Sequence, residues 1–223
     1  SLEALNLSYK KGVRLLELDL RLTSDNKLVA VHDWKHWKKI TNYKKNIPPT
    51  EEEFLSQKIY NKYTPLNLDK IIYWFENHQD ATLITDKFDD INRLEESFGQ
   101  ISSVISEIYS ENYLNLALSK KIPSILISDK LLKKNNYSVD YLYSLLKKEN
   151  KPYGFSVSRY SIYNHHKFFK KAKSLGIKIY VYRLNDGYAG GTEKELLCNF
   201  GDYLDAVYAD NIPELTNNFN FCD

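Results

Sequence analysis

The sequence predicts an α/β fold, a (β/α)8 barrel of the TIM type whose first strand we expect to lie upstream of Ser1. Apolar, β-branched runs alternate with helix-period segments seven times, which indicates a parallel sheet covered by helices. The chain also opens on a helical segment, so one preceding strand would complete the eight of a closed barrel. The alternative is an open doubly wound sheet, but no glycine-rich phosphate loop follows the first strand.

The expected elements follow one another along a single domain, residues 1–223. Strands are expected at 14–22, 81–87, 104–109, 122–128, 153–157, 177–183 and 203–209. Helices are expected at 2–11, 68–77, 90–101, 111–120, 139–149, 161–175 and 192–200. Gly12 and Gly176 suit helix ends, and Asn67 suits a helix start. The stretch at about 33–66 is polar and lysine-rich without a clear period, so we interpret it as a loop insertion with room for short helices.

The composition excludes several classes of protein. A net charge of +2, from 31 Lys+Arg and 29 Asp+Glu, lacks the basic excess of a nucleic-acid-binding protein. No apolar run approaches the roughly 18–20 residues that span a bilayer, and two cysteines are too few for a disulfide scaffold. We expect a cytoplasmic protein of bacterial composition without a nucleic-acid partner or transmembrane segment. Because the chain begins at Ser1 without a Met, a periplasmic or secreted location stays open.

The first expected strand has a charged face and a leucine face. Glu17 and Asp19 alternate with leucines, so the two carboxylates share one face. The residues that follow suit a two-residue type I′ turn at Asp25-Asn26. That turn would set Asp19 directly opposite His32, with Cβ atoms roughly 5 Å apart. The hairpin would then gather two carboxylates and an imidazole.

Glu17 and Asp19 point to a metal. Two carboxylates this close repel each other, and burying them without a partner would cost several kcal/mol. A hard divalent cation relieves the repulsion, and all-oxygen ligands favour Mg²⁺ or Ca²⁺ over Zn²⁺. Asp86 ends the next expected strand and would add a third carboxylate, while Lys87 suits a phosphate oxygen. The alternative is a solvent-exposed ladder of ion pairs along the hairpin.

Other polar side chains are expected at the C-terminal ends of the strands, where barrel active sites lie. They are Glu107, Asp129, Ser158, Arg183 and Asp210. A ring this charged indicates a functional site rather than plain core. His165 and His166 diverge by about 100° on a helix, so we expect them on a surface rather than on one metal.

Four short motifs resemble those of the glycerophosphodiester phosphodiesterases, within the phosphatidylinositol-phospholipase-C-like barrels. They are Glu17-Leu18-Asp19, Thr23-Ser24-Asp25-Asn26, Val31-His32-Asp33 and, as the nearest third-strand match, Thr85-Asp86-Lys87. The resemblance extends over nearly the whole chain but is specific over about residues 1–33. It implies a phosphoric diester hydrolase of lipid metabolism. Such an enzyme releases glycerol 3-phosphate, or a related phosphomonoester, and an alcohol from a small-molecule phosphodiester.

The resemblance also implies roles for single residues. Glu17, Asp19 and Asp86 would hold the divalent cation, His32 would be one of two catalytic histidines, and Lys87 would contact the phosphate. The other histidine is expected on the strand before Ser1. Arg183 stands in the segment that resembles the family's seventh strand, where it would add phosphate contacts or mark a different substrate.

This chain departs from the family pattern in three places, the first of which is the histidine expected before Ser1. The third-strand Glu-x-Lys is here Asp86 directly before Lys87, and the seventh-strand Trp-Thr or Thr-x-Asn is Arg183-Leu184-Asn185. A non-catalytic module that binds anionic head groups on the same fold is one alternative. A lyase that forms a cyclic phosphate is the other. The leaving alcohol, the metal and the oligomeric state do not follow from the sequence.

Overall fold

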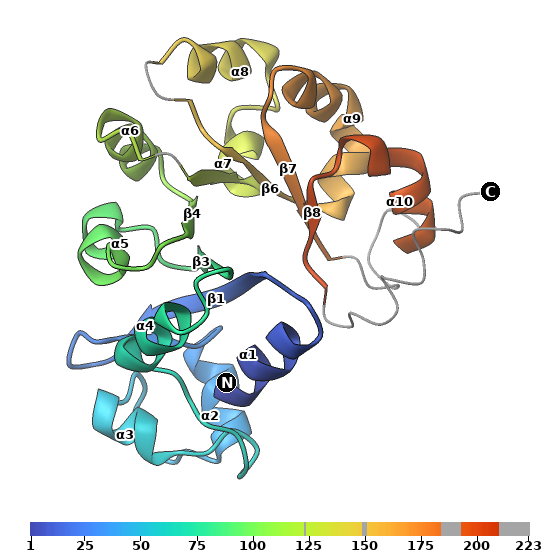
Figure 1. Ribbon diagram of the computed structural model, residues 1–223. Coiled ribbons are helices and arrows are strands. Elements are labelled where there is room, and N and C mark those ends of the chain that lie inside the picture. Colours follow the sequence, from blue (N-terminus) through green and yellow to red (C-terminus); the bar gives the residue numbers. More distant parts are fainter. Residues whose placement is uncertain (123, 149–150, 184–192, 210–223) are drawn as a thin grey trace. The chain divides into compact units, whose positions relative to one another are not determined.

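The structure is a computed structural model that describes residues 1–122, 124–148, 151–183 and 193–209. It divides into two compact units, Ser1–Glu107 and Ile108–Asp223. In both units parallel strands alternate with helices along the chain (Figure 1). The sequence predicted this alternation, and a single domain over 1–223 stays a prediction.

The first unit contains a helix, a hairpin, an insertion, and then two helices that alternate with two strands. Its elements are α1 (Leu2–Lys10), β1 (Leu15–Leu22), β2 (Leu28–Ala30), α2 (Trp34–Thr41), α3 (Glu51–Ser56), α4 (Leu68–Glu76), β3 (Thr82–Asp86), α5 (Ile91–Phe98) and β4 (Val104–Ile108), which ends at the unit boundary. The strands lie in the order β2-β1-β3-β4. Strands β1, β3 and β4 are parallel, and β2 is antiparallel to β1.

The second unit continues the alternation. Its elements are α6 (Glu111–Ser119), β5 (Ile125–Ser128), α7 (Asp129–Lys134), α8 (Val139–Leu146), β6 (Gly154–Ser158), α9 (Arg159–Ser174), β7 (Lys178–Tyr182), α10 (Glu193–Phe200), the 3₁₀ helix η1 (Gly201–Tyr203) and β8 (Ala206–Val207). Strands β5, β6, β7 and β8 are parallel neighbours in that order. Helix α7 was not expected, because six residues with two buried leucines are too short for a periodic pattern.

Burial along the strands decides which side chains are available for chemistry. Every residue of β5 and β6 is buried, as parallel strands covered on both faces require. In β1, Leu16, Leu18 and Leu20 are buried, whereas Glu17 and Asp19 are half-buried on the other face. This confirms the expected alternation and leaves one polar face on β1.

Helix ends follow the predicted local signals. Gly12 and Gly176 have φ of +92° and +82°, the left-handed conformation that glycine adopts without steric cost. The Asn67 side chain accepts a hydrogen bond from the Lys70 backbone N–H at 3.2 Å and caps α4. Single residues therefore predicted these helix ends correctly.

The β1–β2 turn differs from the prediction. Leu22 pairs with Leu28, and the Thr23 N–H donates to the Lys27 carbonyl at 2.9 Å, so three residues, 24–26, rather than two form the turn. Asn26 takes the left-handed φ of +62°, which fits a type I turn closed by one left-handed residue. The register moves by one, and the Val31 N–H donates to the Asp19 carbonyl at 2.8 Å. The prediction that Asp19 lies directly opposite His32 is therefore wrong.

The insertion of residues 33–66 is folded and has a small core of its own. Trp37 of α2 and Phe54 of α3 pack against Val29 and Tyr43, and none of the four is more than 5% exposed. Each large apolar side chain buried this way contributes roughly 1.5–3 kcal/mol. The two short helices agree with the expectation, but the buried aromatic cluster was not foreseen.

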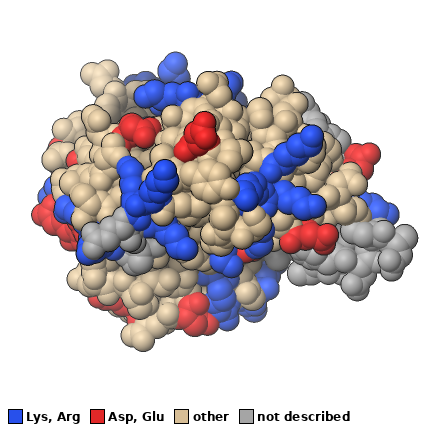
Figure 2. Space-filling model, turned by 90° about the horizontal axis from the view of Figure 1, so that it is seen from above, with Lys and Arg blue, Asp and Glu red and all other residues tan. Residues whose placement is uncertain are grey.

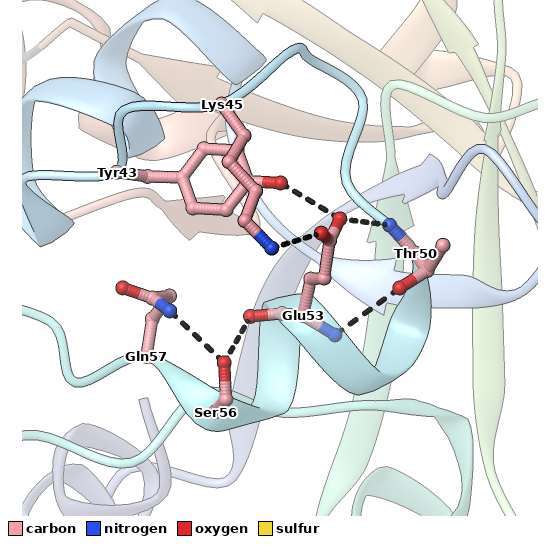
Figure 3. Close-up of polar contacts among 6 residues, drawn as sticks. All are labelled: Tyr43, Lys45, Thr50, Glu53, Ser56 and Gln57. Carbon is pink, nitrogen blue, oxygen red and sulfur yellow. Dashed lines mark hydrogen bonds and ion pairs between the residues drawn. The ribbon is translucent and has the colours of Figure 1, made fainter.

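Polar contacts around Glu53 fix the start of α3 (Figure 3). Its carboxylate accepts hydrogen bonds from the Tyr43 hydroxyl at 2.7 Å, the Lys45 ammonium at 2.8 Å and the Thr50 N–H at 3.2 Å. The Thr50 hydroxyl in turn accepts from the Glu53 N–H, which completes a capping box. The contacts join Glu53 to Lys45, eight residues earlier in the insertion, and to Tyr43, ten residues earlier.

Candidate active site

Three carboxylates meet on the polar face of β1. Glu17 and Asp19 come from β1 and Asp86 from the end of β3, and one ligand atom from each lies within 4.8 Å of the others. Asp19 and Asp86 are register partners in parallel strands, so their side chains leave the sheet on the same side. The structure therefore brings together the three residues predicted to bind a metal, while the metal itself stays a prediction.

Lys87 adds a cation to this cluster. The backbone of Lys87 is left-handed, with φ of +62°, and its ammonium lies 3.1 Å from Asp86 Oδ2 and 3.8 Å from Asp19 Oδ1. Burial disfavours the charged amine, but Asp86, Asp19 and the buried Glu107 of β4 outweigh burial and raise the pKa of Lys87. A charged ammonium is thus held where three acidic side chains converge.

The electrostatics of the cluster favour a cation. Burial, followed by the neighbouring Asp86 carboxylate, raises the pKa of Asp19 to about 6, against the opposing charges of Lys87 and His32. A divalent cation would relieve this repulsion, and three carboxylate oxygens are ligands that Mg²⁺ or Ca²⁺ prefers. The residues present therefore fit the predicted cofactor.

His32 is positioned by the residue that follows it. The side chain is 62% exposed, and its Nδ1 lies 2.8 Å from Asp33 Oδ2. The other carboxylate oxygen of Asp33 accepts from the His36 N–H at 2.7 Å and caps α2. This backbone bond, and then His32, lower the pKa of Asp33. His32 lies close enough to lower the pKa of Asp19, although the two are not register partners.

The sequence analysis did not foresee the role of Asp33. Its carboxylate joins His32 to the start of a helix, and a His-Asp pair before a helical segment is the signal that could have shown it. A carboxylate on one ring nitrogen selects the tautomer and leaves the other nitrogen for proton transfer.

The remaining residues of the predicted ring belong to the second unit. Arg183 follows β7, is exposed, and holds its guanidinium 5.8 Å from the centre of the Tyr182 ring. Its contact with a phosphate stays a prediction. Ser158 and Ser161 both donate to Asp129 Oδ2, at 2.8 and 2.7 Å, in a network that ties α7 to α9. Asp210 lies outside the described residues.

Two further expectations concern the surface. His165 stacks on Tyr137 at 3.8 Å, and neither it nor His166 joins a metal-binding cluster in the part of the chain that the structure describes. On the face drawn in Figure 2, Lys and Arg side chains are interspersed with uncharged and acidic ones. Among the described residues, no helix is long and apolar enough to cross a membrane.

Comparison with known proteins relates this geometry to a family. Residues 1–90 match the model of the glycerophosphoryl diester phosphodiesterase family. No curated protein matches the chain. The match over residues 1–90 confirms the family resemblance inferred from the motifs, and the predicted class of enzyme, a phosphoric diester hydrolase, is that of the family.

Solved structures share the fold of nearly the whole chain. A glycerophosphodiester phosphodiesterase from Thermotoga maritima is 20% identical, with a TM-score of 0.73 over 97% of this chain and 90% of that one. One from Parabacteroides distasonis is 18% identical, with 0.71 over 97% and 87%. An Oleispira antarctica phosphodiesterase, solved with the product sn-glycerol-3-phosphate, is 16% identical, with 0.69 over 98% and 90%. These likenesses confirm the predicted fold class.

Proposed function

We propose that this chain, whose residues 1–90 match the glycerophosphoryl diester phosphodiesterase family, hydrolyses a glycerophosphodiester-like substrate. The products are glycerol 3-phosphate, or a related phosphomonoester, and an alcohol. The observation that carries the proposal is the convergence of three carboxylates within 4.8 Å, with the Lys87 ammonium beside them. A cytoplasmic location and a small-molecule substrate rather than a nucleic acid belong to the same proposal.

Each residue of the site has a separate role in this proposal. A Mg²⁺ or Ca²⁺ ion would be held by Glu17, Asp19 and Asp86. When bound, this cation stabilises charge on the phosphoryl oxygens and activates the hydroxyl group that attacks the phosphorus. Lys87 contacts a phosphate oxygen as a point charge and keeps the site from being purely anionic. His32, with Nδ1 held by Asp33, transfers a proton at its other ring nitrogen. Arg183 would supply a further phosphate contact.

Product release with defined diesters tests the proposal. The full-length protein is incubated with glycerophosphocholine and glycerophosphoethanolamine, in Mg²⁺, in Ca²⁺ or in EDTA, and glycerol 3-phosphate is measured. We expect release that depends on the cation, and a loss of roughly 100-fold or more in kcat/KM for Glu17→Gln. The matched control is Glu76→Gln, an exposed residue at the end of α4. Equal activity in the two variants, or no phosphomonoester under any condition, would overturn the proposal.

The two alternatives give different products. A lyase on this site would yield a cyclic phosphate, which phosphorus NMR separates from a monoester. A binding module would bind cation and diester without releasing either product. The Lys87–Asp86 ion pair at 3.1 Å is the observation that favours such a module, because it neutralises part of the cluster without a metal.

A further inference from the structure

A pocket lies within the second unit, and none of the residues that line it belongs to the carboxylate cluster of β1 and β3. It has a volume of about 470 Å³ and is formed by the start of α6 and one face of α7. Pockets that bind small molecules typically measure about 300–1,000 Å³. The pocket follows the C-terminal ends of β4 and β5, the side of parallel strands on which ligands bind.

Two lysines make the α7 wall basic. Lys130 and Lys134 are four residues apart, so they lie on the same face of the helix, and both line the pocket. Both are exposed, and no ion pair of either is found within the described residues. Like charges at this spacing repel each other, and an anion between them removes the repulsion. Leu131 gives this wall an apolar part beside the charges.

The α6 wall supplies donors and one acid. Tyr109 and Asn112 line it, and the side-chain amide of Asn112 is a neutral donor suited to a phosphate or alcohol oxygen. Glu111, in the first turn of α6, lines the same wall and disfavours an anion there. The negative group of a ligand therefore belongs on the lysine side, and its neutral, hydroxyl-bearing part on the α6 side.

We propose that this pocket binds a small organic phosphate, with the phosphate on Lys130 and Lys134 and its hydroxylated carbon part against Tyr109 and Asn112. The pocket shares no residue with the proposed hydrolytic centre, and its proposal does not depend on that function. Inorganic phosphate shares the charge but lacks the carbon part, so the two ligands are compared directly.

Site-resolved NMR of the whole chain tests the pocket independently of activity. Inorganic phosphate, glycerol 3-phosphate and uncharged glycerol are titrated in turn, and the amide signals of Glu111 and Asn112 are followed. We expect both phosphates to shift them, glycerol 3-phosphate at lower concentration, and glycerol to leave them unchanged. Lys87→Ala is included as a background that weakens phosphate binding at the proposed hydrolytic centre without touching the pocket.

Charge-matched variants separate the pocket from a general effect of net charge. Lys130→Gln with Lys134→Gln should weaken glycerol 3-phosphate binding roughly tenfold. Lys133→Gln with Lys147→Gln removes the same charge outside the pocket. This pair should change the affinity for glycerol 3-phosphate less than about twofold. Lys130→Arg with Lys134→Arg keeps the charge and should bind glycerol 3-phosphate like the unchanged chain, which separates loss of charge from a change of side-chain shape. Equal weakening in both Gln pairs, or shifts caused equally by glycerol, would overturn the proposal.

Discussion

Asp19 gives the candidate site a clear dependence on pH. Its pKa is raised to about 6 by burial and by the neighbouring Asp86 carboxylate, whereas an unfolded aspartate titrates near 4. The folded state therefore holds this proton more tightly than the unfolded state does. The resulting stabilisation is complete below about pH 4 and is lost as the pH rises through 6. Its upper limit is roughly 3 kcal/mol.

Replacing Asp19 should remove this pH dependence. In cation-free buffer, the free energy of unfolding of Asp19→Asn relative to that of the unchanged chain should rise by about 1–3 kcal/mol as the pH increases from 4 to 8. The reason is that the amide carries no charge at either pH. Urea unfolding at several pH values measures the difference. Asp140→Asn, an exposed aspartate of α8, serves as the control and should follow the unchanged chain. Parallel curves for Asp19→Asn and the unchanged chain would contradict the prediction.

His32 and His36 form a matched pair for testing proton transfer. Both are exposed, but His32 has the Asp33 contact at 2.8 Å and acts electrostatically on Asp19. His32→Asn should lower kcat/KM for diester hydrolysis roughly 10²–10⁴-fold, whereas His36→Asn should keep it within about twofold. Steady-state kinetics with cation present measures both. Similar losses in the two variants would remove His32 from the proposed mechanism.

At the scale of elements, the start of α3 depends on Glu53. The Lys45 ammonium, then the Tyr43 hydroxyl and the Thr50 N–H, lower the pKa of Glu53 to about 2 (Figure 3). Because the folded-state pKa lies below that of an unfolded glutamate, this stabilisation is present above about pH 4.3 and is lost as the pH falls through 2.

Glu53→Gln should therefore lower Tm at neutral pH. The amide cannot accept three hydrogen bonds with a full negative charge, and the capping box is weakened. Thermal unfolding measures the change at pH 7 and at pH 2.5, where the difference from the unchanged chain should shrink. Glu52→Gln alters the adjacent, exposed carboxylate and should leave Tm almost unchanged. A larger effect at position 52 would show that helix charge, not the Glu53 network, stabilises the insertion.

For the whole molecule, cation binding should be visible as stability. A ligand that binds only the folded state stabilises it by about 2.7 kcal/mol at 100 times its Kd. Mg²⁺ or Ca²⁺ should therefore raise Tm in a concentration-dependent way, and EDTA should reverse the shift. The effect should disappear in Glu17→Gln and persist in Glu76→Gln. A cation effect of equal size in both variants would place the bound cation elsewhere.

The fold persists at low sequence identity for a physical reason. The Thermotoga maritima structure shares 20% of its residues with this chain but superposes with a TM-score of 0.73. A parallel strand covered on both faces needs apolar residues of suitable volume rather than particular ones. In the completely buried strand β5, Ile and Leu both fill such positions, whereas β6 requires glycine at position 154, where a Cβ would lie 2.6 Å from the Lys178 carbonyl oxygen.

By itself, the sequence determined the alternation of strands and helices, the polar face of β1 and the caps at Gly12, Asn67 and Gly176. These features depend on residue spacing and on the conformational range of single residues, both of which are local. The approach of Asp86 to Asp19 was also predictable in outline, since parallel neighbours align their C-terminal ends.

The tertiary structure alone decided the details that join distant residues. The turn near Asn26 has three residues and not two, so the register of β1 and β2 differs by one from the predicted register. Asp19 therefore does not lie opposite His32. The aromatic core of the insertion, the Glu53 network and the pocket between α6 and α7 likewise bring together segments whose spacing in sequence carries no period. Contacts of this kind depend on how elements pack, which residue patterns within one element do not specify.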